Sequence, residues 1–123
     1  MIKLTFCIRR QPHLTREQFL DYWLNKHGPL VKKHSAALNM RRYVQLHALD
    51  DPINKAMREG RGAPEAFDGV AELWWESKEE MAGAFTTPEG RVAGKELMED
   101  EKNFIDHARS PLWIGEEKPI VGD

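Results

Sequence analysis

The feature that most constrains this chain is an amphipathic stretch over residues 15–38, TREQFLDYWLNKHGPLVKKHSAAL. Its first residue, Thr15, forms a capping box with Gln18, which predicts that a helix begins here. Helical spacing gives this helix one apolar face that ends on a histidine: Phe19, Leu20, Trp23 and His27. Because such a face must be buried, the stretch predicts a sheet packed against it.

The sequence predicts a break in this helix at Gly28 and Pro29. Glycine readily takes the left-handed conformation that ends a helix, and proline is favoured at the first position of a new one. We therefore expect one helix to end after His27 and a second to continue to Leu38. The imidazole of His27 would then lie where an apolar face stops and the chain turns.

Four segments alternate with the period of two that is typical of strands: residues 2–10, 39–49, 67–76 and 112–114. Further helix-opening signals at Ser77 and at Thr87 follow the third of them. The order is strand, helix, strand, strand, helix, strand. It predicts an α+β fold of the ferredoxin-like, split βαβ type, with a four-stranded antiparallel sheet and the helices on one face.

The length of 123 residues predicts a single domain, residues 1–123, around one core. Residues 50–66 form the one long connection, with at most one helical turn around residues 53–58. A loop of this length is typical of a lid, a binding loop or a mobile excursion. Residues 115–123 are polar and are expected to form a C-terminal arm.

Charge and composition argue against several classes of protein. A net charge of −2 and an isoelectric point near 6.2 provide no basic surface for nucleic acid or an anionic membrane. No apolar run approaches the length of a membrane span, and the N-terminal MIKLTFCIRR is typical of a strand rather than of a signal peptide. The single cysteine provides no disulfide framework, which favours a cytoplasmic protein.

The sheet face away from the helices is expected to be of mixed polarity. Alternation assigns to it Cys7, Tyr43, Gln45, His47, Glu72 and Trp74. Such a surface is too apolar to stay bare and too polar for a dry core. Two sheets packed face to face would close a barrel and hide it from solvent, so we expect a homodimer formed through this face.

Four segments of the chain resemble the EthD family, within the dimeric α+β barrel superfamily. In order they are LTREQFLDYWLNKHGPLV, RRYVQLHAL, FDGVAELWWES and FIDHARSPLWIGEE, and they span nearly the whole chain. The first and third are the most specific. Phe67 and Trp75 stand where the family more often has tyrosine and phenylalanine, and the loop at residues 50–66 is longer than in the smallest members.

The resemblance implies a homodimeric α+β barrel with a cavity in each protomer between sheet and helices. The family is named for a protein of ether-degradation clusters, and fungal relatives resemble decarboxylases or oxygenases that act on polyketide intermediates without a metal or organic cofactor. The wider superfamily includes muconolactone isomerases, quinol monooxygenases and haem-binding dechlorinating enzymes. The resemblance therefore defines the fold more narrowly than the reaction.

His27 is the leading candidate for acid–base chemistry, because an imidazole can take and return a proton near neutral pH. The alternative is a histidine at a helix end that donates to a backbone carbonyl. We expect His27 at the rim of a cavity whose other wall orients the substrate or holds developing charge, formed by Tyr43, His47 and Glu72. Tyr43 and His47 would otherwise lie at the dimer interface or at the sheet edge.

A second group of residues is predicted to contact the substrate: Cys7, Trp23, Gln45, Asp68 and Trp74. Each has a structural alternative. Tryptophans are more often part of a core, and a lone cysteine is often a small buried hydrophobe. Asp68 can equally be a residue that starts a strand, beside Gly69.

The histidines do not predict a metal site. They form neither an HExxH motif nor a paired Cys-His spacing, so we predict no metal, and the resemblance implies chemistry without a cofactor. A haem-binding version of the barrel would need an axial ligand, for which His34 or His107 could be proposed.

These observations predict a small cofactor-independent enzyme that holds an oxygenated aromatic or polyketide-like molecule in the protomer cavity. The reaction would begin with removal of a proton by His27. Decarboxylation, dehydration, isomerisation and cofactor-free oxygenation all begin in this way, so a lyase, an isomerase or a monooxygenase would fit. Two alternatives are a binding protein with the same cavity and a haem- or metal-dependent oxidoreductase of the same superfamily.

Overall fold

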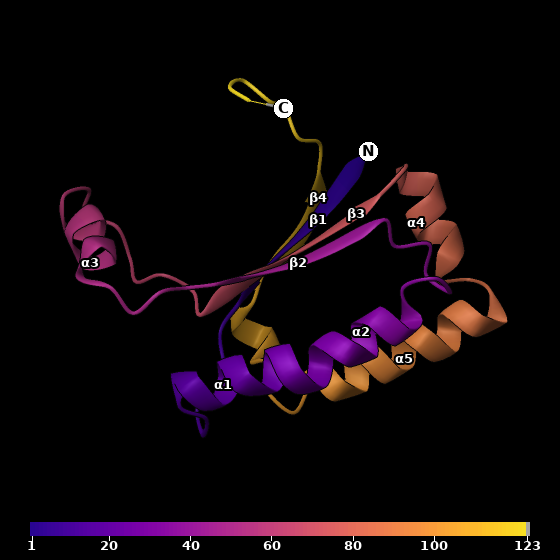
Figure 1. The fold of residues 1–123 in the computed structure, drawn as a ribbon, viewed down its shortest axis with the longest axis horizontal. Helices are drawn as coiled ribbons and strands as arrows, with labels where there is room; N and C mark the ends of the chain where they lie inside the picture. Colours follow the sequence, from indigo (N-terminus) through magenta and orange to yellow (C-terminus); the bar gives the residue numbers. More distant parts are fainter. Residues whose placement is uncertain (123) are drawn as a thin grey trace.

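The computed structural model describes residues 1–122, and it contains the predicted four-stranded antiparallel sheet. The strands are β1 (Ile2–Ile8), β2 (Arg42–His47), β3 (Gly69–Trp75) and β4 (Leu112–Gly115). Their order across the sheet is β2-β3-β1-β4, with every neighbouring pair antiparallel. The helices pack below one face of the sheet, whereas no helix of the described chain covers the other (Figure 1). This is the ferredoxin-like arrangement that the sequence predicts.

The helices begin at the predicted caps. They are α1 (Arg16–Tyr22), a π-helical segment (Trp23–His27), α2 (Gly28–His34), α4 (Lys78–Ala84) and α5 (Pro88–Glu101), with a 3₁₀ turn at His107–Arg109. The side chains of Thr15, Ser77 and Thr87 each accept a hydrogen bond from a backbone N–H three residues later. None of these helices is long and apolar enough to cross a membrane, within residues 1–122.

The predicted break at Gly28 is wrong, because α1, the π-helical segment and α2 form one continuous arm (Figure 1). Gly28 has right-handed helical angles, with φ −53° and ψ −52°, and its N–H bonds the carbonyl of Trp23 five residues earlier. Pro29 explains this wider turn. Its ring carries no N–H and would clash with a carbonyl four residues back in a regular α-helix. The helix therefore bulges instead of ending, and His27 lies in the bulge.

The long loop contains more helix than the sequence predicted. Helix α3 covers Pro52–Glu59, and the Asp51 side chain caps it by accepting from the N–H of Ile53 at 2.9 Å. An aspartate followed by proline is itself a helix-opening signal, since it supplies the cap and the first helical position. Figure 1 shows α3 projecting away from the sheet and the other helices.

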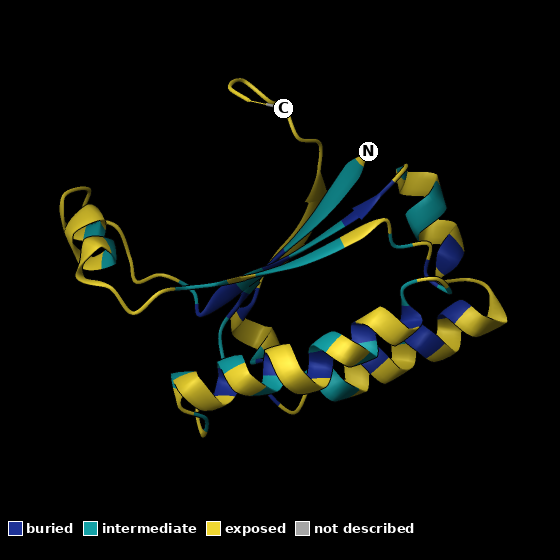
Figure 2. Cartoon of the chain, in the orientation of Figure 1, coloured by how far each residue is buried: buried dark blue, intermediate teal, exposed yellow. Residues whose placement is uncertain are grey.

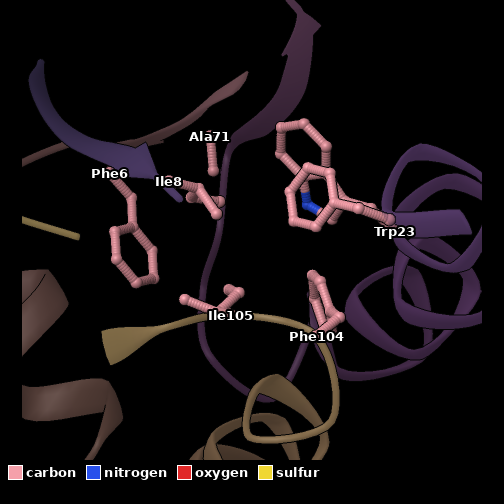
Figure 3. Close-up of a cluster of buried hydrophobic side chains, with 7 residues drawn as sticks. Phe6, Ile8, Trp23, Ala71, Phe104 and Ile105 are labelled. Atoms are coloured by element: carbon pink, nitrogen blue, oxygen red, sulfur yellow. The ribbon is translucent and has the colours of Figure 1, made fainter. Parts of the chain in front are cut away.

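The main core lies where the helical arm crosses the sheet. Figure 3 shows its side chains converging from β1, β3, the arm and the segment after α5, namely Phe6, Ile8, Trp23, Ala71, Phe104 and Ile105. A Cβ on Gly69 would collide with the indole of Trp23, so glycine at this position lets the ring lie against β3. The helices below the sheet carry their buried residues toward it and expose the opposite side, whereas α3 has no buried residue (Figure 2).

The register of the sheet separates side chains that the sequence analysis placed together. Tyr43 is paired with Leu73 and Gln45 with Ala71, so both point toward the helices with the core residues of β3. His47, two residues further, shares that face. The opposite, open face instead carries Cys7, Glu72 and Trp74. The expectation that all six lie on one face is therefore wrong for β2.

Candidate active site

A cavity of about 190 Å³ lies between the sheet and the helices, and we call it the central cavity. Its wall is mostly apolar, with side chains that include Leu4, Phe6, Trp23, Ala71, Leu73 and Leu97. The titratable side chains on this wall are His27, Tyr43 and Glu101. An apolar cavity with a few convergent polar groups is the usual form of a site for a small molecule.

His27 is oriented by a carboxylate. The imidazole is only 5% exposed, and its Nδ1 lies 2.8 Å from Oδ2 of Asp100 on α5. Because an ionised carboxylate only accepts hydrogen bonds, Nδ1 carries the proton and Nε2 is the unprotonated nitrogen of the neutral ring. No hydrogen bond within residues 1–122 engages Nε2, which leaves it available to a molecule in the central cavity. The alternative of a backbone carbonyl partner for His27 is wrong.

Asp100 is itself held in place by a second donor. The hydroxyl of Tyr22 on α1 donates to Oδ1 of Asp100 at 2.5 Å. Burial opposes ionisation of this carboxyl, but hydrogen bonds from Tyr22 and His27 outweigh burial and lower the pKa of Asp100 below its usual value. Asp100 is thus a carboxylate at neutral pH, and it would stabilise His27 once His27 has taken up a proton.

The hydroxyl of Tyr43 is held by Gln45, two residues further along β2. Nε2 of Gln45 lies 2.9 Å from the Tyr43 oxygen and 2.9 Å from the backbone carbonyl of Trp23. A carbonyl can only accept, so this nitrogen donates to both oxygens. The phenol proton of Tyr43 remains free for a molecule in the cavity. Burial raises the pKa of Tyr43 to about 12, partly opposed by the hydrogen bond from Gln45, so the phenol stays protonated at neutral pH.

His47 holds the side chain of Gln45 in place. Its Nε2 lies 2.8 Å from Oε1 of Gln45, and because that oxygen accepts, Nε2 carries the proton. The ring stacks on the indole of Trp23, with centroids 4.8 Å apart and planes 15° from parallel. Burial lowers the pKa of His47, which favours the neutral ring. His47 lies on a groove along the outer edge of β2 rather than on the central cavity, so it acts through Gln45.

Three of the predicted site residues point away from the central cavity. Glu72 lies on the open face, with its carboxylate 3.4 Å from Nζ of Lys3, so the expectation that Glu72 shares a cavity with His27 is wrong. Trp74 also lies on the open face, against the cationic groups of Lys3 and Arg42. Cys7 lies on that face too, and burial raises the pKa of its thiol. The cause is register, since all three alternate away from the core residues of β1 and β3.

Asp68 has a structural position at the start of β3. Its carboxylate accepts the backbone N–H of Arg10 at 2.8 Å and pairs with the guanidinium of the same residue. This ion pair fixes the end of β1 against β3, at a site removed from the central cavity. Of the residues predicted to bind substrate, Trp23 does line the cavity, and Gln45 contacts Tyr43 at its wall.

Three residues of the site were not predicted from the sequence: Tyr22, Asp100 and Glu101. The two acidic residues belong to the run MEDEKNFID, which is typical of a solvated helix end. Helical spacing did carry a signal, because positions 100 and 101 lie three and four residues after Leu97 and four and three before Phe104. Both of those apolar residues are buried in the structure.

Within residues 1–122, no three side chains of histidine, cysteine, aspartate or glutamate gather closely enough to hold a metal ion. The two histidines considered as haem ligands both have carboxylate partners. Nε2 of His34 lies 2.6 Å from Glu96, and Nε2 of His107 lies 2.9 Å from Glu101.

Comparison with known proteins confirms the resemblance in sequence and fold. Residues 11–108 match the EthD domain. An EthD family protein from Bacillus halodurans C-125 has a TM-score of 0.63 at 24% identity, and the match covers 96% of this chain and 99% of that one. A dimeric ferredoxin-like protein of unknown function from Bacteroides fragilis NCTC 9343 has a TM-score of 0.59 at 12% identity, with 94% and 95% covered.

A third structure is SnoaB from Streptomyces nogalater, described as a cofactor-independent oxygenase. It has a TM-score of 0.51 at 13% identity, and the match covers 98% of each chain. At these identities the three structures define the fold alone. No curated protein sequence matches the chain. Because the family match covers most of the sequence, the chain belongs to the EthD family.

Proposed function

We propose that this protein is a cofactor-independent enzyme that removes a proton from an oxygenated small molecule bound in the central cavity. The observation that carries the proposal is His27, whose Nδ1 is held 2.8 Å from Asp100 while Nε2 is left to the cavity. General-base catalysis needs an unprotonated nitrogen at a fixed position, and this geometry supplies one. The likeness to SnoaB, a cofactor-independent oxygenase, supports this class of chemistry.

In the proposed mechanism, Nε2 of His27 accepts the proton from a carbon or hydroxyl of the substrate. The positive charge that forms on the imidazole lies beside the Asp100 carboxylate, which favours this state electrostatically. Tyr22 keeps Asp100 oriented through its own hydrogen bond. Asp100 therefore acts through His27, as a positioning residue.

Tyr43 supplies a hydrogen-bond donor for the negative charge that forms on the substrate. Removal of a proton next to a carbonyl leaves negative charge on the carbonyl oxygen, and a fixed donor at that point lowers the barrier. The phenol proton of Tyr43 is free to donate, because the oxygen already accepts from Gln45. With a pKa of about 12, Tyr43 donates a hydrogen bond without losing its proton at neutral pH.

A homodimer formed through the open sheet face completes the proposal. The face exposes large apolar side chains, with Leu46 at 56% and Trp113 at 53% of their full accessible surface. Burial of such side chains in a second sheet is favourable. The dimeric ferredoxin-like protein from Bacteroides fragilis supports this assembly.

The proton-transfer step can be tested without knowing the natural substrate. Single-ring ketones such as cyclohexanone and acetophenone would be incubated with the protein in D₂O, and exchange of the protons beside the carbonyl followed by NMR. We expect the wild type to accelerate exchange, and His27→Ala to reduce that acceleration by about 10²- to 10⁴-fold. His34→Ala is the matched control, because His34 lies on the same helical arm with its own carboxylate partner but away from the central cavity.

Two results would count against the proposal. Exchange that is equally fast in the wild type and in folded His27→Ala would remove the base from the mechanism. Ketones that bind without any accelerated exchange would favour a binding protein with the same cavity.

A further inference from the structure

A second imidazole–carboxylate pair reaches the central cavity from α5. Glu101 follows Asp100 directly, and consecutive residues of a helix point about 100° apart. Asp100 therefore turns toward Tyr22 and His27, whereas Glu101 turns toward the central cavity, whose wall it joins. This pair lies outside the proton-transfer step proposed above.

His107 holds one oxygen of this carboxylate. Its Nε2 lies 2.9 Å from Oε1 of Glu101, and because the carboxylate accepts, the imidazole donates. The His107 ring lies parallel to the ring of Phe6 on β1, with centroids 6.4 Å apart and planes 7° from parallel. Within residues 1–122, no side-chain hydrogen bond engages Oε2 of Glu101. Glu101 thus presents a fixed acceptor to the cavity, with its side chain 21% exposed.

The size of the cavity limits what can bind beside Glu101. A closed apolar cavity of about 150 Å³ accommodates benzene. At about 190 Å³, the central cavity has room for one six-membered ring with small substituents. The exposed side chains on its wall are Phe85, Met98 and Leu112, so an apolar rim surrounds the opening. Both features favour a small, mostly apolar molecule over a fused-ring system.

The charge of Glu101 limits the polar groups of that molecule. A carboxylate accepts hydrogen bonds strongly from hydroxyl donors, and it repels a second carboxylate in a cavity of low polarity. Tyr43 is affected by the same charge, since Glu101 contributes to raising the pKa of Tyr43, after burial as the largest cause. A ligand hydroxyl is therefore favoured at this wall, and a ligand carboxylate is disfavoured.

We infer that Glu101, oriented by His107, binds a hydroxyl of the ligand, so that the central cavity takes a neutral, single-ring phenol or enol and rejects ring carboxylates. The inference rests on the proposed function in that both use the same cavity. It concerns recognition alone, and it can be tested by binding without any turnover.

The test compares three ligands of nearly equal size: phenol, toluene, which lacks the hydroxyl, and benzoate. Binding to the full-length protein at pH 7 would be measured by calorimetry. We expect the wild type to prefer phenol to each of the others by about tenfold or more, as a hydrogen bond to a charged group provides. Glu101→Gln should lower the preference for phenol over benzoate by about tenfold or more. Its matched control, Glu96→Gln, removes another carboxylate of α5, one that pairs with His34 on α2 and lies off the cavity. This variant should leave the preference unchanged.

A second pair of variants separates recognition from a purely structural ion pair, and remains informative if Glu101→Gln fails to fold. His107→Gln keeps an amide donor for Glu101 and should retain most of the preference for phenol. His107→Phe keeps an aromatic ring against Phe6 but cannot donate, and it should lower the preference.

Several results would overturn the inference: a wild type that binds none of the three ligands, a wild type that binds benzoate as tightly as phenol, or a folded Glu101→Gln with the wild-type preference. The proposed function is tested separately. It fails if ketone protons exchange equally fast in the wild type and in folded His27→Ala. Selective phenol binding without exchange would retain the recognition site and remove the proton-transfer step.

Discussion

Two imidazole–carboxylate pairs join the same helical arm to the same helix α5, and they differ in what they leave free. In the first, His27 uses Nδ1 toward Asp100, whose side chain is 18% exposed. In the second, His34 uses Nε2 toward Glu96 at 2.6 Å, and the Glu96 side chain is 46% exposed. His27 lines the central cavity and His34 does not. Two histidine–carboxylate pairs between the same helical arm and the same helix therefore form two different kinds of site.

The difference shows that an imidazole–carboxylate pair does not by itself define an acid–base site. In the His34 pair, Nε2 contacts a half-exposed carboxylate, and the contact joins α2 to α5. The His27 pair directs Nδ1 to a carboxylate that is mostly shielded from solvent and leaves Nε2 beside an apolar cavity. His27 lies in the π-helical bulge and His34 at the end of the regular α2, so the continuous helix carries them in different surroundings.

The largest expected difference between the pairs is in proton transfer. Asp100→Asn should reduce exchange of ketone protons by on the order of 10²-fold or more, because the asparagine amide can donate to Nδ1 and move the imidazole proton to Nε2. Glu96→Gln should leave the rate unchanged. The measurement is the NMR exchange rate of each variant, and equal losses in both would show that the two pairs are not functionally distinct.

The pH dependence of stability provides a further test of Asp100→Asn. Because the pKa of Asp100 is lowered in the folded protein, its ionised form stabilises the fold above the ordinary carboxyl range near pH 4. This contribution is lost as the pH falls through the lowered pKa of Asp100. Urea unfolding should therefore separate wild type from Asp100→Asn at neutral pH, and the gap should shrink in acid.

An effect of intermediate size is expected at high pH, where Tyr43 reports on the cavity beside His27. A tyrosine in the unfolded chain ionises near pH 10, and Tyr43 in the folded protein at about 12. The unfolded state thus loses its proton first, so stability should fall by about 2–3 kcal/mol as the pH rises from about 10 to about 12. Urea unfolding at several pH values measures this loss.

Tyr43→Phe is the control for the alkaline effect, because it removes the ionising group and should flatten this part of the stability curve. The wild-type tyrosinate absorbance should also rise later in the folded than in the unfolded protein. A folded protein in which Tyr43 titrates near pH 10 would contradict the burial of its hydroxyl.

The smallest effect is expected at the pair of His34 with Glu96. Glu96→Gln should change the free energy of unfolding by less than about 1 kcal/mol, because a half-exposed carboxylate gains little from an ion pair. Urea unfolding of this variant beside Asp100→Asn gives the comparison directly. A loss at Glu96 larger than that at Asp100 would reverse the order argued from their exposure.

Local patterns in the sequence were sufficient to predict much of the fold. Capping boxes and alternation placed the helices and strands, and their order gave the ferredoxin-like topology. Two local rules were misapplied. Glycine followed by proline does not always end a helix, because a π-helical bulge also accommodates proline, as at Gly28 and Pro29. The Asp51-Pro52 signal for α3 was overlooked.

The candidate site was predicted less completely than the fold. His27 and Tyr43 were singled out and do line one cavity. Glu72 was placed beside them because the pairing of β2 with β3 cannot be read from either strand alone, and a shift of one residue reverses every side chain. Asp100 belongs to an acidic run, and its helical spacing from Leu97 and Phe104 indicates the side of the helix on which it lies but not that His27 is its partner.

The sequence by itself determined the elements, their order and the position of an imidazole on an apolar helical face. These follow from contacts within a few residues, such as caps, periodicity and the constraint at Pro29. Only the tertiary structure decided which nitrogen of His27 is free, which face of β2 meets the helices, and which carboxylates of α5 reach the cavity. Those outcomes depend on pairs far apart in the chain, such as His27 with Asp100 and Gln45 with Trp23, and local patterns carry no record of such pairs.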